Sequence, residues 1–326
     1  MTNQLRWGFI GNGWIAKVLA EDFKVAGLKI QAIGARSQAK ADEFANTYGI
    51  PNRHDSYEKL VNDSEVDIVY VATPHPFHVR NAILALNAGK HVLCEKPFTI
   101  NEKEAIQIKE AATRNNRFVM EAMWARFLPV QNEIQRIVKR GDIGKVKIVV
   151  ADHTRYLVDI RRLWDPELGG GALLDLGVYP IHLIVRLLGI PTKIESSAKL
   201  SPEKIDEYLM CKMDFEDGAM ATFLTTNSVA GANRAVIYGE KGRIEVDGSA
   251  WDATTFSLFN QSGDLISKYE ERHPGTGRQF QALEVERCIR EGLLESPLLP
   301  VDETIAIMRI MDQIRNQIGV KYPMEK

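Results

Sequence analysis

Residues 5–16 read Leu5-Arg6-Trp7-Gly8-Phe9-Ile10-Gly11-Asn12-Gly13-Trp14-Ile15-Ala16. The run up to Ile10 is typical of a buried strand, and the residues after it keep the spacing Gly-x-Gly-x-x-Ala. In this fingerprint the first glycine permits a tight turn, the second lets a pyrophosphate approach the backbone, and the small third residue lets helix and strand pack closely. The following helix would present its unpaired N–H groups and positive dipole end to the phosphates. A dinucleotide-binding unit is therefore predicted, the alternative being a glycine-rich turn without a cofactor. The predicted cofactor contacts in this stretch are Gly11, Asn12, Gly13, Trp14 and Ile15.

Strand and helix signals alternate through the first part of the chain. Apolar or β-branched runs predict further strands at residues 29–35, 66–72, 91–94 and 118–123. Helices are predicted up to residue 26, at 38–48, at 77–88 and after Asn101, which forms a capping-box pattern with Glu104. Strands that alternate with helices favour a parallel sheet covered on both faces. We therefore predict an α/β fold with a Rossmann domain at residues 1–121.

The rest of the chain is richer in period-two patterns. Helices are predicted at residues 129–140, 277–291 and 302–318. Strands are predicted at residues 146–153, 207–215, 219–227, 235–238, 243–246 and 255–260, some of them separated by Asp-Gly or Ser-Gly turns. We predict an α+β domain at residues 122–326 with a large, mainly antiparallel open sheet, whose final helix could pack back near the first domain.

Length and composition restrict the protein further. A chain of 326 residues suggests two domains, and 45% apolar with 26% charged residues is typical of a globular protein. The net charge of −2 gives no general attraction to nucleic acid or to anionic membranes. The start is polar, no apolar run approaches the ~18 residues of a membrane span, and the three distant cysteines form no disulfide or metal pattern. We expect a cytoplasmic protein without a signal peptide, a metal, or a nucleic-acid or membrane partner.

The end of the second strand bears on the choice of cofactor. An NAD-binding domain places an acid there, about 20 residues after the fingerprint, to bind the ribose 2′-hydroxyl. This chain has Arg36 and Ser37 at that point and Lys40 one helical turn later, with no carboxylate. Arg36 can form a charge-assisted fork with a 2′-phosphate or stack on adenine, Ser37 can donate a hydrogen bond, and Lys40 adds positive charge. We therefore predict NADP(H) over NAD(H), the alternative being that these are solvated surface side chains.

Polar residues also follow the next two strands, at the edge where doubly wound sheets bind ligands. After the third strand, Thr73, His75 and His78 could contact the cofactor or cap the following helix, and no nearby acid or cysteine completes a metal site. After the fourth, Glu95 and Lys96 precede a proline that fixes the backbone. These two ionisable groups are predicted at the mouth of the cofactor cleft, although a strand that simply ends in a charged turn would look the same.

A second unusual segment covers residues 169–180. Its three leading glycines would let the backbone approach a ligand closely, or form a flexible loop before a capped helix. Asp175 and Tyr179 are four residues apart and share one face if the segment is helical. A tyrosine hydroxyl has an ordinary pKa of about 10 and needs a neighbouring cation to act near neutral pH. The functional interpretation therefore sets Asp175 and Tyr179 opposite Lys96 across a cleft between the domains.

Together these motifs resemble those of the Gfo/Idh/MocA oxidoreductases over essentially the whole length. The closer likeness is to the branch of dimeric dihydrodiol dehydrogenases and NADP-dependent D-xylose dehydrogenases, which residues 120–127, 168–179 and 303–308 look like. The resemblance implies a Rossmann domain and a second domain whose open sheet forms a homodimer or tetramer. It also implies that Lys96 and Tyr179 form the acid–base pair, with Asp175 in support. Many sugar-alcohol members carry histidine where this chain has Tyr179, which points toward the dihydrodiol/aldose branch. The residues that resemble the lining of that branch's substrate pocket are Trp124 and His153, and further aromatic candidates are Trp164 and Trp251.

The sequence thus predicts an NADP(H)-dependent enzyme that interconverts a hydroxyl and a carbonyl group by hydride transfer. Its substrate would be a sugar, a cyclic polyol or a dihydrodiol-like small molecule. Two alternatives share the scaffold. A non-catalytic NADP-sensing regulator is disfavoured by the presence of Lys96, Asp175 and Tyr179 together. A glycosidase that retains its nicotinamide and uses it transiently would need no added cofactor.

Overall fold

The chain forms two compact units in a computed structural model that describes residues 4–325. The first unit contains Met1–Trp124 and Pro274–Met308, and the second contains Ala125–His273 and Arg309–Lys326. Residues 274–308, assigned to the second domain by the sequence analysis, thus belong to the first unit, and the division falls inside α9 (Val301–Ile318). Long-range packing decides this return of the chain, so no local pattern marks it. Residues 1–3, on which the signal-peptide prediction partly depends, lie outside the described residues.

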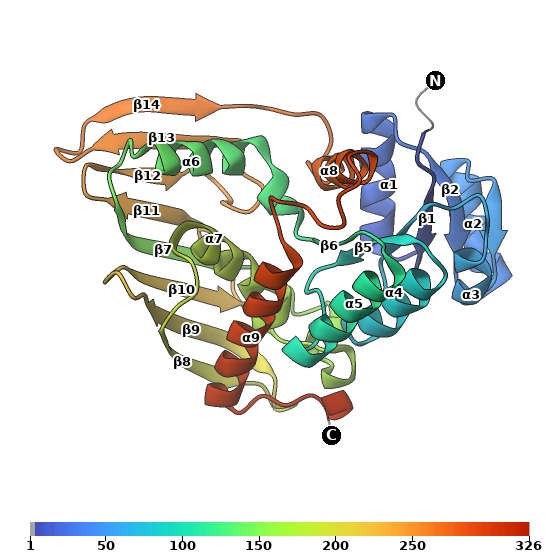
Figure 1. The fold of residues 1–326 in the computed structure, drawn as a ribbon. Coiled ribbons are helices and arrows are strands. Elements are labelled where there is room, and N and C mark those ends of the chain that lie inside the picture. The colour runs from blue at the N-terminus through green and yellow to red at the C-terminus, as the bar shows by residue number, and fades with distance from the viewer. Residues whose placement is uncertain (1–3, 326) are drawn as a thin grey trace. The chain divides into compact units, whose positions relative to one another are not determined.

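The first unit is built on a six-stranded parallel sheet in the order β3-β2-β1-β4-β5-β6 (Figure 1). The strands are β1 (Trp7–Ile10), β2 (Ile30–Gly34), β3 (Asn52–His54), β4 (Ile68–Val71), β5 (His91–Glu95) and β6 (Val119–Ala122). β1 and β4 are buried throughout, which explains their uninterrupted apolar sequences. The strand order reverses between β1 and β4, and ligands bind at such a switch point in doubly wound sheets. The predicted Rossmann arrangement is confirmed.

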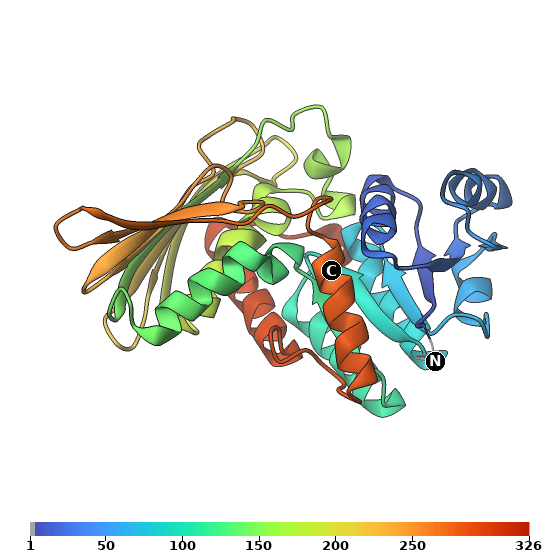
Figure 2. The same cartoon turned by 90° about the horizontal axis from the view of Figure 1, so that it is seen from above.

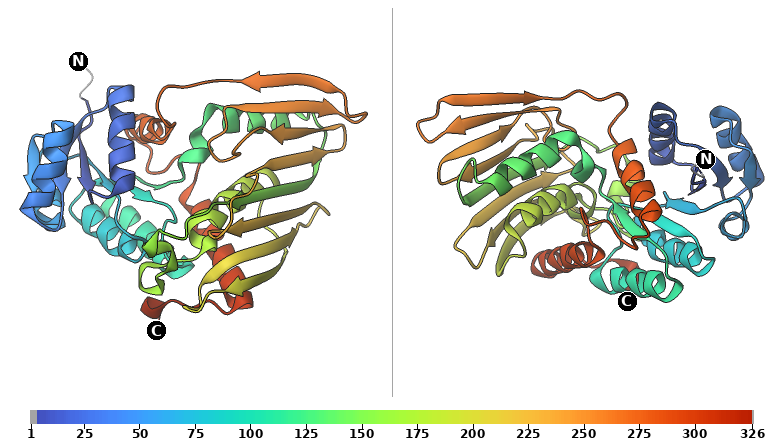
Figure 3. Two further views of the ribbon diagram at one scale, coloured as in Figure 1. Left: turned by 180° about the vertical axis from the view of Figure 1, so that it is seen from behind. Right: turned by 45° about the horizontal axis from the view of Figure 1, so that its top comes forward.

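Helices cover both faces of this sheet (Figures 2 and 3). The connecting helices are α1 (Trp14–Ala26), α2 (Gln38–Tyr48), α3 (Tyr57–Val61), α4 (His78–Asn87) and α5 (Glu102–Asn115). The later α8 (Gln279–Arg290) packs on α1, and a hydrogen bond from Trp7 Nε1 to Glu286 Oε1 (2.9 Å) ties it to β1. The predicted cap of α5 is confirmed, since the Asn101 side chain accepts from the Glu104 N–H at 3.0 Å.

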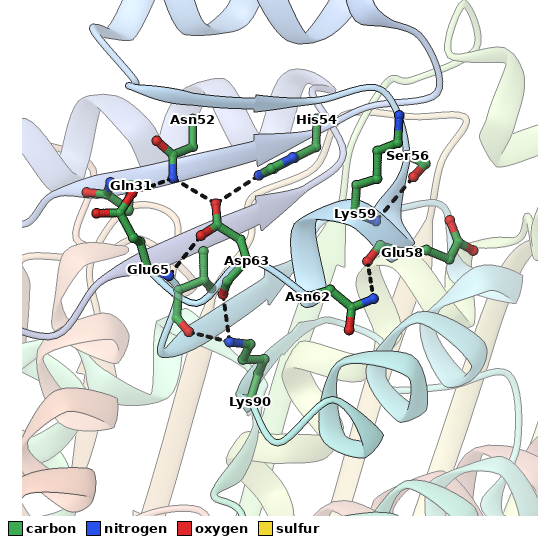
Figure 4. A network of polar contacts seen from close by, with 11 residues as sticks. Gln31, Asn52, His54, Ser56, Glu58, Lys59, Asn62, Asp63, Glu65 and Lys90 are labelled. Carbon is green, nitrogen blue, oxygen red and sulfur yellow. Dashed lines mark hydrogen bonds and ion pairs between the residues drawn. The ribbon is translucent and has the colours of Figure 1, made fainter.

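Two elements of the first unit, β3 and α3, were not predicted because they are short and polar. Side-chain hydrogen bonds hold this region in place (Figure 4). The Asp63 carboxylate accepts from Asn52 Nδ2 at 2.7 Å and lies 2.9 Å from His54 Nε2. The Lys90 ammonium donates to the Asp63 carbonyl at 2.8 Å. Polar contacts therefore fix this edge of the sheet, where the sequence offers no apolar pattern to detect.

The second unit is built on an eight-stranded sheet in the order β14-β13-β12-β11-β7-β10-β9-β8 (Figure 1). All neighbouring strands are antiparallel except β7 and β10, so the predicted mainly antiparallel sheet is confirmed. β8 and β14 were not predicted, because charged and polar residues interrupt their apolar pattern. The strands are β7 (Val146–Thr154), β8 (Lys193–Leu200), β9 (Asp206–Asp214), β10 (Met220–Thr226), β11 (Ala235–Gly239), β12 (Gly242–Val246), β13 (Thr255–Asn260) and β14 (Leu265–Glu270).

The two faces of this second sheet differ. α6 (Pro129–Arg140) and α7 (Val178–Leu188) cover one face (Figure 3). On the other face, apolar side chains of the central strands are exposed, and cross-strand pairs such as Met220 with Ile148 make them neighbours. The exposed apolar residues on this face include Ile148, Val150, Tyr208, Met210, Met220 and Tyr238.

One helical stretch, Pro166–Leu188, is long and apolar enough by length and composition to cross a membrane, with a mean hydropathy of 1.5. The sequence analysis, which looked for an uninterrupted apolar run, did not single it out. Of its most apolar window, 83% is buried inside the protein. The core helix of a globular domain passes the same test, so the stretch gives little reason by itself to expect a membrane span.

Candidate active site

The fingerprint turn has the geometry that its sequence predicts. Gly11 adopts a positive φ of 96°, and a Cβ there would come within 2.7 Å of the Ala72 carbonyl oxygen. Its N–H donates to the Gly34 carbonyl at the end of β2 at 3.1 Å, which fixes the turn between β1 and α1. A Cβ on Gly13 would meet nothing within 4 Å, so the start of α1 has open space beside its backbone. The fully buried Ala16 allows the close packing of helix and strand that the pattern requires.

The side chains predicted around the adenine ribose follow β2. Arg36, Ser37 and Lys40 are all exposed. The sequence analysis missed two further residues of this region, Tyr57 and Arg80, because no local pattern connects them to Arg36. The Arg36 and Arg80 guanidinium groups act on the Tyr57 hydroxyl and oppose the rise in its pKa that burial causes. A cluster of positive charge therefore lies where β2 ends.

His78 joins the loops that follow β4 and β5. Its Nε2 lies 2.7 Å from the Thr73 carbonyl oxygen and its Nδ1 lies 2.9 Å from that of Pro97. The ring is completely buried, and burial lowers its pKa. His75 is also buried, with its ring 5.8 Å from that of His78. The described contacts of His78 are thus structural, while its predicted role toward a cofactor stays a prediction.

The Glu95–Lys96 motif is held by buried hydrogen bonds. The Tyr70 hydroxyl donates to Glu95 Oε1 at 2.5 Å, and the Lys96 backbone N–H donates to Glu95 Oε2 at 3.1 Å. Burial raises the pKa of Glu95, and the Tyr70 hydrogen bond and the Lys96 charge oppose that rise. Beyond the cis Lys96–Pro97 bond, Glu121 accepts from the Phe98 N–H at 3.1 Å. The backbone around Lys96 is therefore fixed on both sides.

Trp124 belongs to the first unit and packs against a residue from the late segment. The Arg278 guanidinium lies 4.0 Å from the centre of the Trp124 ring. The segment that carries Arg278 is anchored on α1, because the buried Asp22 accepts from the Arg278 N–H at 2.9 Å and from the Thr276 N–H at 2.8 Å. No sequence pattern connects Asp22 with residues so distant along the chain.

In the second unit, Asp175 and Tyr179 lie at the start of a long buried helix. Asp175 is within a π-helical turn, Leu173–Gly177, and Tyr179 is in the first turn of α7. A π turn closes its hydrogen bonds over one more residue than an α turn, so the predicted sharing of one helical face does not carry over directly. Asp175 is buried, and its Oδ1 pairs with Arg162 Nη2 at 3.1 Å.

The triple glycine before this helix makes room for a carboxylate of the protein itself. A Cβ on Gly171, whose φ is 117°, would overlap Asp206 Oδ1. Asp206 Oδ2 accepts from the Leu173 N–H at 2.6 Å and so caps the helix from β9. Burial raises the pKa of Asp206 to about 7. Of the two sequence interpretations, this contact favours the capped helix, and Asp206 was missed because it lies far along the chain.

Three of the predicted site residues, His153, Tyr179 and Trp251, contact one another through their rings in the second unit. The His153 ring lies 4.8 Å from that of Tyr179 at 90° and 5.2 Å from that of Trp251. The Tyr179 and Trp251 rings are 6.0 Å apart. His153 Nδ1 lies 3.1 Å from the Leu176 carbonyl oxygen, which fixes the ring against the π turn. Trp164 instead donates its indole N–H to the Leu157 carbonyl at 3.2 Å.

The arrangement of the described side chains also bears on whether the protein could bind a metal ion. Within residues 4–325, no group of three or more His, Cys, Asp or Glu side chains is placed to hold a metal ion. The predicted site residues Lys96, Tyr179, Glu95 and Asp175 instead carry side chains of the kinds that transfer protons.

Two domain families match the chain. Residues 5–123 match the Gfo/Idh/MocA oxidoreductase family with an NAD-binding Rossmann fold, and residues 132–245 match the Gfo/Idh/MocA C-terminal domain. The trans-1,2-dihydrobenzene-1,2-diol dehydrogenase of Danio rerio is 35% identical, with 98% of this chain and 99% of that protein aligned.

Solved structures give the same picture of the fold. The aldose-aldose oxidoreductase from Caulobacter crescentus, in complex with glycerol, is 25% identical with a TM-score of 0.86, over 97% of this chain and 98% of that one. A levoglucosan dehydrogenase in complex with NADH and levoglucosan has a TM-score of 0.87 at 20% identity, over 98% of this chain and all (100%) of that one.

Proposed function

Because the chain belongs to the Gfo/Idh/MocA oxidoreductase family, we propose that it is an NADP(H)-dependent dehydrogenase. It would interconvert a hydroxyl and a carbonyl group on a sugar, a cyclic polyol or a dihydrodiol-like molecule. The observation that carries the proposal is Lys96, held by the buried Tyr70–Glu95 pair directly after a central strand of a dinucleotide-type sheet. Relatives named for dihydrodiol and sugar oxidation support the same class of reaction.

Lys96 and Tyr179 are the proposed acid–base pair. In the oxidative direction the Tyr179 phenol oxygen would take the hydroxyl proton, while Lys96 would stabilise the negative charge on that oxygen. Asp175, itself paired with Arg162, would orient the substrate end of the site. The bound nicotinamide would supply the acceptor for the hydride that leaves the carbinol carbon.

The cofactor would be held by the fingerprint turn and by the cations after β2. The open space at Gly13 suits a pyrophosphate at the start of α1. Arg36 and Lys40 would bind a 2′-phosphate, and Ser37 would donate a hydrogen bond to it. A carboxylate that would repel that phosphate is missing from residues 35–40, which favours NADP(H) over NAD(H). The remaining proposed contacts are Asn12, Trp14, Ile15, Thr73, His75, His78 and Glu95.

The substrate would lie against aromatic side chains. His153 and Trp251 form a wall beside Tyr179, and such faces suit the C–H groups of a sugar or a dihydrodiol ring. Trp124 would contribute from the first unit. Both indole N–H groups donate to a backbone carbonyl, that of Trp251 to Asp152 and that of Trp164 to Leu157. Trp164 is the weaker candidate because the described ring contacts with His153 and Tyr179 are those of Trp251.

The exposed surface and the cysteines support a proposal for assembly and for location. The exposed apolar face of the second sheet would pair with a second copy of the chain in a homodimer or tetramer. Cys94, Cys211 and Cys288 are free and buried, which suits a reducing cytoplasm.

A substrate panel tests the proposal. Aldoses, inositols, trans-dihydrodiols and diketones would be offered with NADP(H) and, in parallel, NAD(H), and the absorbance of the reduced nicotinamide would be followed. We expect turnover with at least one class, faster with NADP(H). Release of product from a glycoside without added cofactor, and no turnover of the panel, would favour the glycosidase alternative.

A further inference from the structure

We propose that Tyr70 is a positioning residue for this reaction: its hydroxyl orients the Glu95 carboxylate, and that carboxylate fixes the backbone from which Lys96 extends. The inference rests on the proposed function, because it assigns a role to the support of a proposed catalytic lysine. It concerns only residues of the first unit.

Sheet register explains why Tyr70 reaches Glu95. Tyr70 on β4 pairs with Leu93 on β5, and Glu95 is two residues beyond Leu93. Side chains two apart on a strand share a face, so Tyr70 and Glu95 are diagonal neighbours on the same side of the sheet. The Tyr70 ring is fully buried (0% exposed) and packs edge-on against Phe9, with ring centres 4.9 Å apart. The ring is therefore held in place independently of its hydrogen bond.

The hydrogen bonds of Glu95 leave its carboxylate one orientation. Oε1 accepts from Tyr70 at 2.5 Å and Oε2 accepts from the Lys96 N–H at 3.1 Å. Glu95 is only 5% exposed, and a buried carboxylate without donors would be strongly destabilised. The Tyr70 hydroxyl is thus the side-chain donor that lets the charged carboxylate stay buried and aligned with the Lys96 backbone.

The charges that face Glu95 come from three elements. Lys96 follows it directly after β5 and Arg278 lies at the start of α8, and both favour the carboxylate form. Tyr70 on β4 remains a donor, because burial and the neighbouring Glu95 charge raise its pKa well above the ordinary value. Cys94 is next in sequence, and burial together with Glu95 and Glu121 raises the pKa of its thiol, so it stays neutral.

Removing the hydroxyl should therefore act through Glu95. In Tyr70→Phe the ring still packs on Phe9, but Oε1 loses its donor, and the pKa of Glu95 rises further. The acidic limb of the pH profile of kcat should move to higher pH, and kcat at neutral pH should fall about 10-fold or more, since hydrogen bonds to charged groups are among the strong ones. KM should change much less than kcat.

A double-mutant cycle with Glu95→Gln tests this route. If Tyr70 acts through the carboxylate, Tyr70→Phe should lower kcat in the wild type but have little further effect, less than about 2-fold, in the Glu95→Gln background. Tyr48→Phe serves as the matched control, because its hydroxyl only approaches the Lys17 carbonyl at 3.5 Å, and it should leave the pH profile unchanged. Fully additive effects, or a uniform loss at every pH, would overturn the positioning role.

A binding measurement separates this inference from the proposed function. Because Glu95 is itself a proposed cofactor contact, the fall of NADPH affinity on the acidic side should begin at a higher pH in Tyr70→Phe, even when no substrate is known. Nucleotide fluorescence between about pH 5.5 and 8 would measure that affinity. If the wild type turns over a substrate but Tyr70→Phe matches it at every pH in both assays, the positioning role alone fails. If the wild type binds NADPH but turns over no substrate of the panel with either nucleotide, the proposed function fails.

Discussion

Two regions carry the proposed catalytic residues, and each rests on a buried carboxylate of a different kind. In the loop after β5, both oxygens of Glu95 accept hydrogen bonds, from Tyr70 and from the Lys96 N–H. At the helix start before Tyr179, Asp206 Oδ2 accepts from Leu173, while Oδ1 is buried and has no hydrogen-bond partner among the described residues. Donors on both oxygens favour a charged carboxylate, whereas a half-satisfied one favours the proton. Burial nevertheless raises the pKa of both carboxyls, to about 7 for Asp206, while the Tyr70 hydrogen bond and the Lys96 charge oppose the rise at Glu95. The carboxyl under the helix start before Tyr179 should therefore titrate near neutral pH.

Removal of the reacting groups themselves should have the largest effect. Lys96→Met and Tyr179→Phe should each lower kcat by about 10²- to 10⁴-fold, the contribution that general acid–base groups make. NADPH binding, measured by fluorescence, should be largely retained in both. Steady-state rates with a substrate from the panel would check this. Near-wild-type rates in both variants would remove the assignment of the pair.

The Asp206 carboxyl should give the next largest effect, on stability. The folded state raises the pKa of Asp206 from 3.8 to about 7, so it binds the proton more tightly than the unfolded chain does. The contribution of this proton to the stability of the folded state is therefore complete below the pKa of the unfolded chain, and it is lost as the pH rises through the folded-state pKa of about 7. The Asp206→Asn side chain stays neutral at every pH. The free energy of unfolding of this variant, relative to that of the wild type, should therefore increase by about 1–4 kcal/mol from pH 5 to pH 8.

Urea denaturation of both proteins at the two pH values measures this difference. The groups that face Asp206 are Arg315, whose charge opposes the rise in pKa, and the Tyr322 hydroxyl, which donates to the Gly170 carbonyl at 2.6 Å. Asp264→Asn, at an exposed turn, is the matched control and should show no such pH dependence. An equal response of the two variants would contradict a proton on Asp206.

Loss of the cation after β2 should have a smaller effect, confined to the cofactor. Arg36→Ala should weaken NADPH about 10- to 100-fold and NADH much less, because a charge-assisted fork to phosphate is lost. Arg53→Ala is a useful control, because Arg53 is also an exposed arginine of the first unit but is paired with Asp42 at 3.5 Å. Dissociation constants for both nucleotides decide the matter, and an equal loss for NADH and NADPH would refute a 2′-phosphate contact.

The contrast between the two regions also shows what a sequence can predict. Gly11 and Lys96 were found because fingerprint turns and strand ends are local patterns, and the structure places them directly after β1 and β5. Tyr70 was not found, since a tyrosine in an apolar strand reads as core. Asp206 contacts Leu173, 33 residues away, and no periodicity encodes such a contact. The residues that support both regions, Tyr70 and Asp206, therefore act through tertiary contacts that the sequence does not reveal. The residues that they support lie in local sequence motifs and could be predicted.

The register before Tyr179 makes the same point at finer scale. The spacing of Asp175 and Tyr179 predicted a shared α-helical face, but a π turn intervenes. Such a turn depends on what packs around it, here Asp206 on the Leu173 N–H and His153 against the Leu176 carbonyl. Helical spacing alone therefore did not predict the local geometry between these two residues, whose catalytic roles stay a prediction.

The smallest expected effect distinguishes two tryptophans of the second unit. Each indole N–H donates to a backbone carbonyl, but only the Trp251 ring has described contacts with the rings of His153 and Tyr179. If the aromatic wall binds substrate, Trp251→Leu should raise KM about 3- to 10-fold, the loss expected for one aromatic contact, with kcat nearly unchanged. Trp164→Leu should leave KM within about 2-fold of the wild type if it lies outside the wall. The same KM for both variants would show that ring contacts around Tyr179 do not mark the substrate surface, and the polar region at Asp175 would then be the better place to look for it.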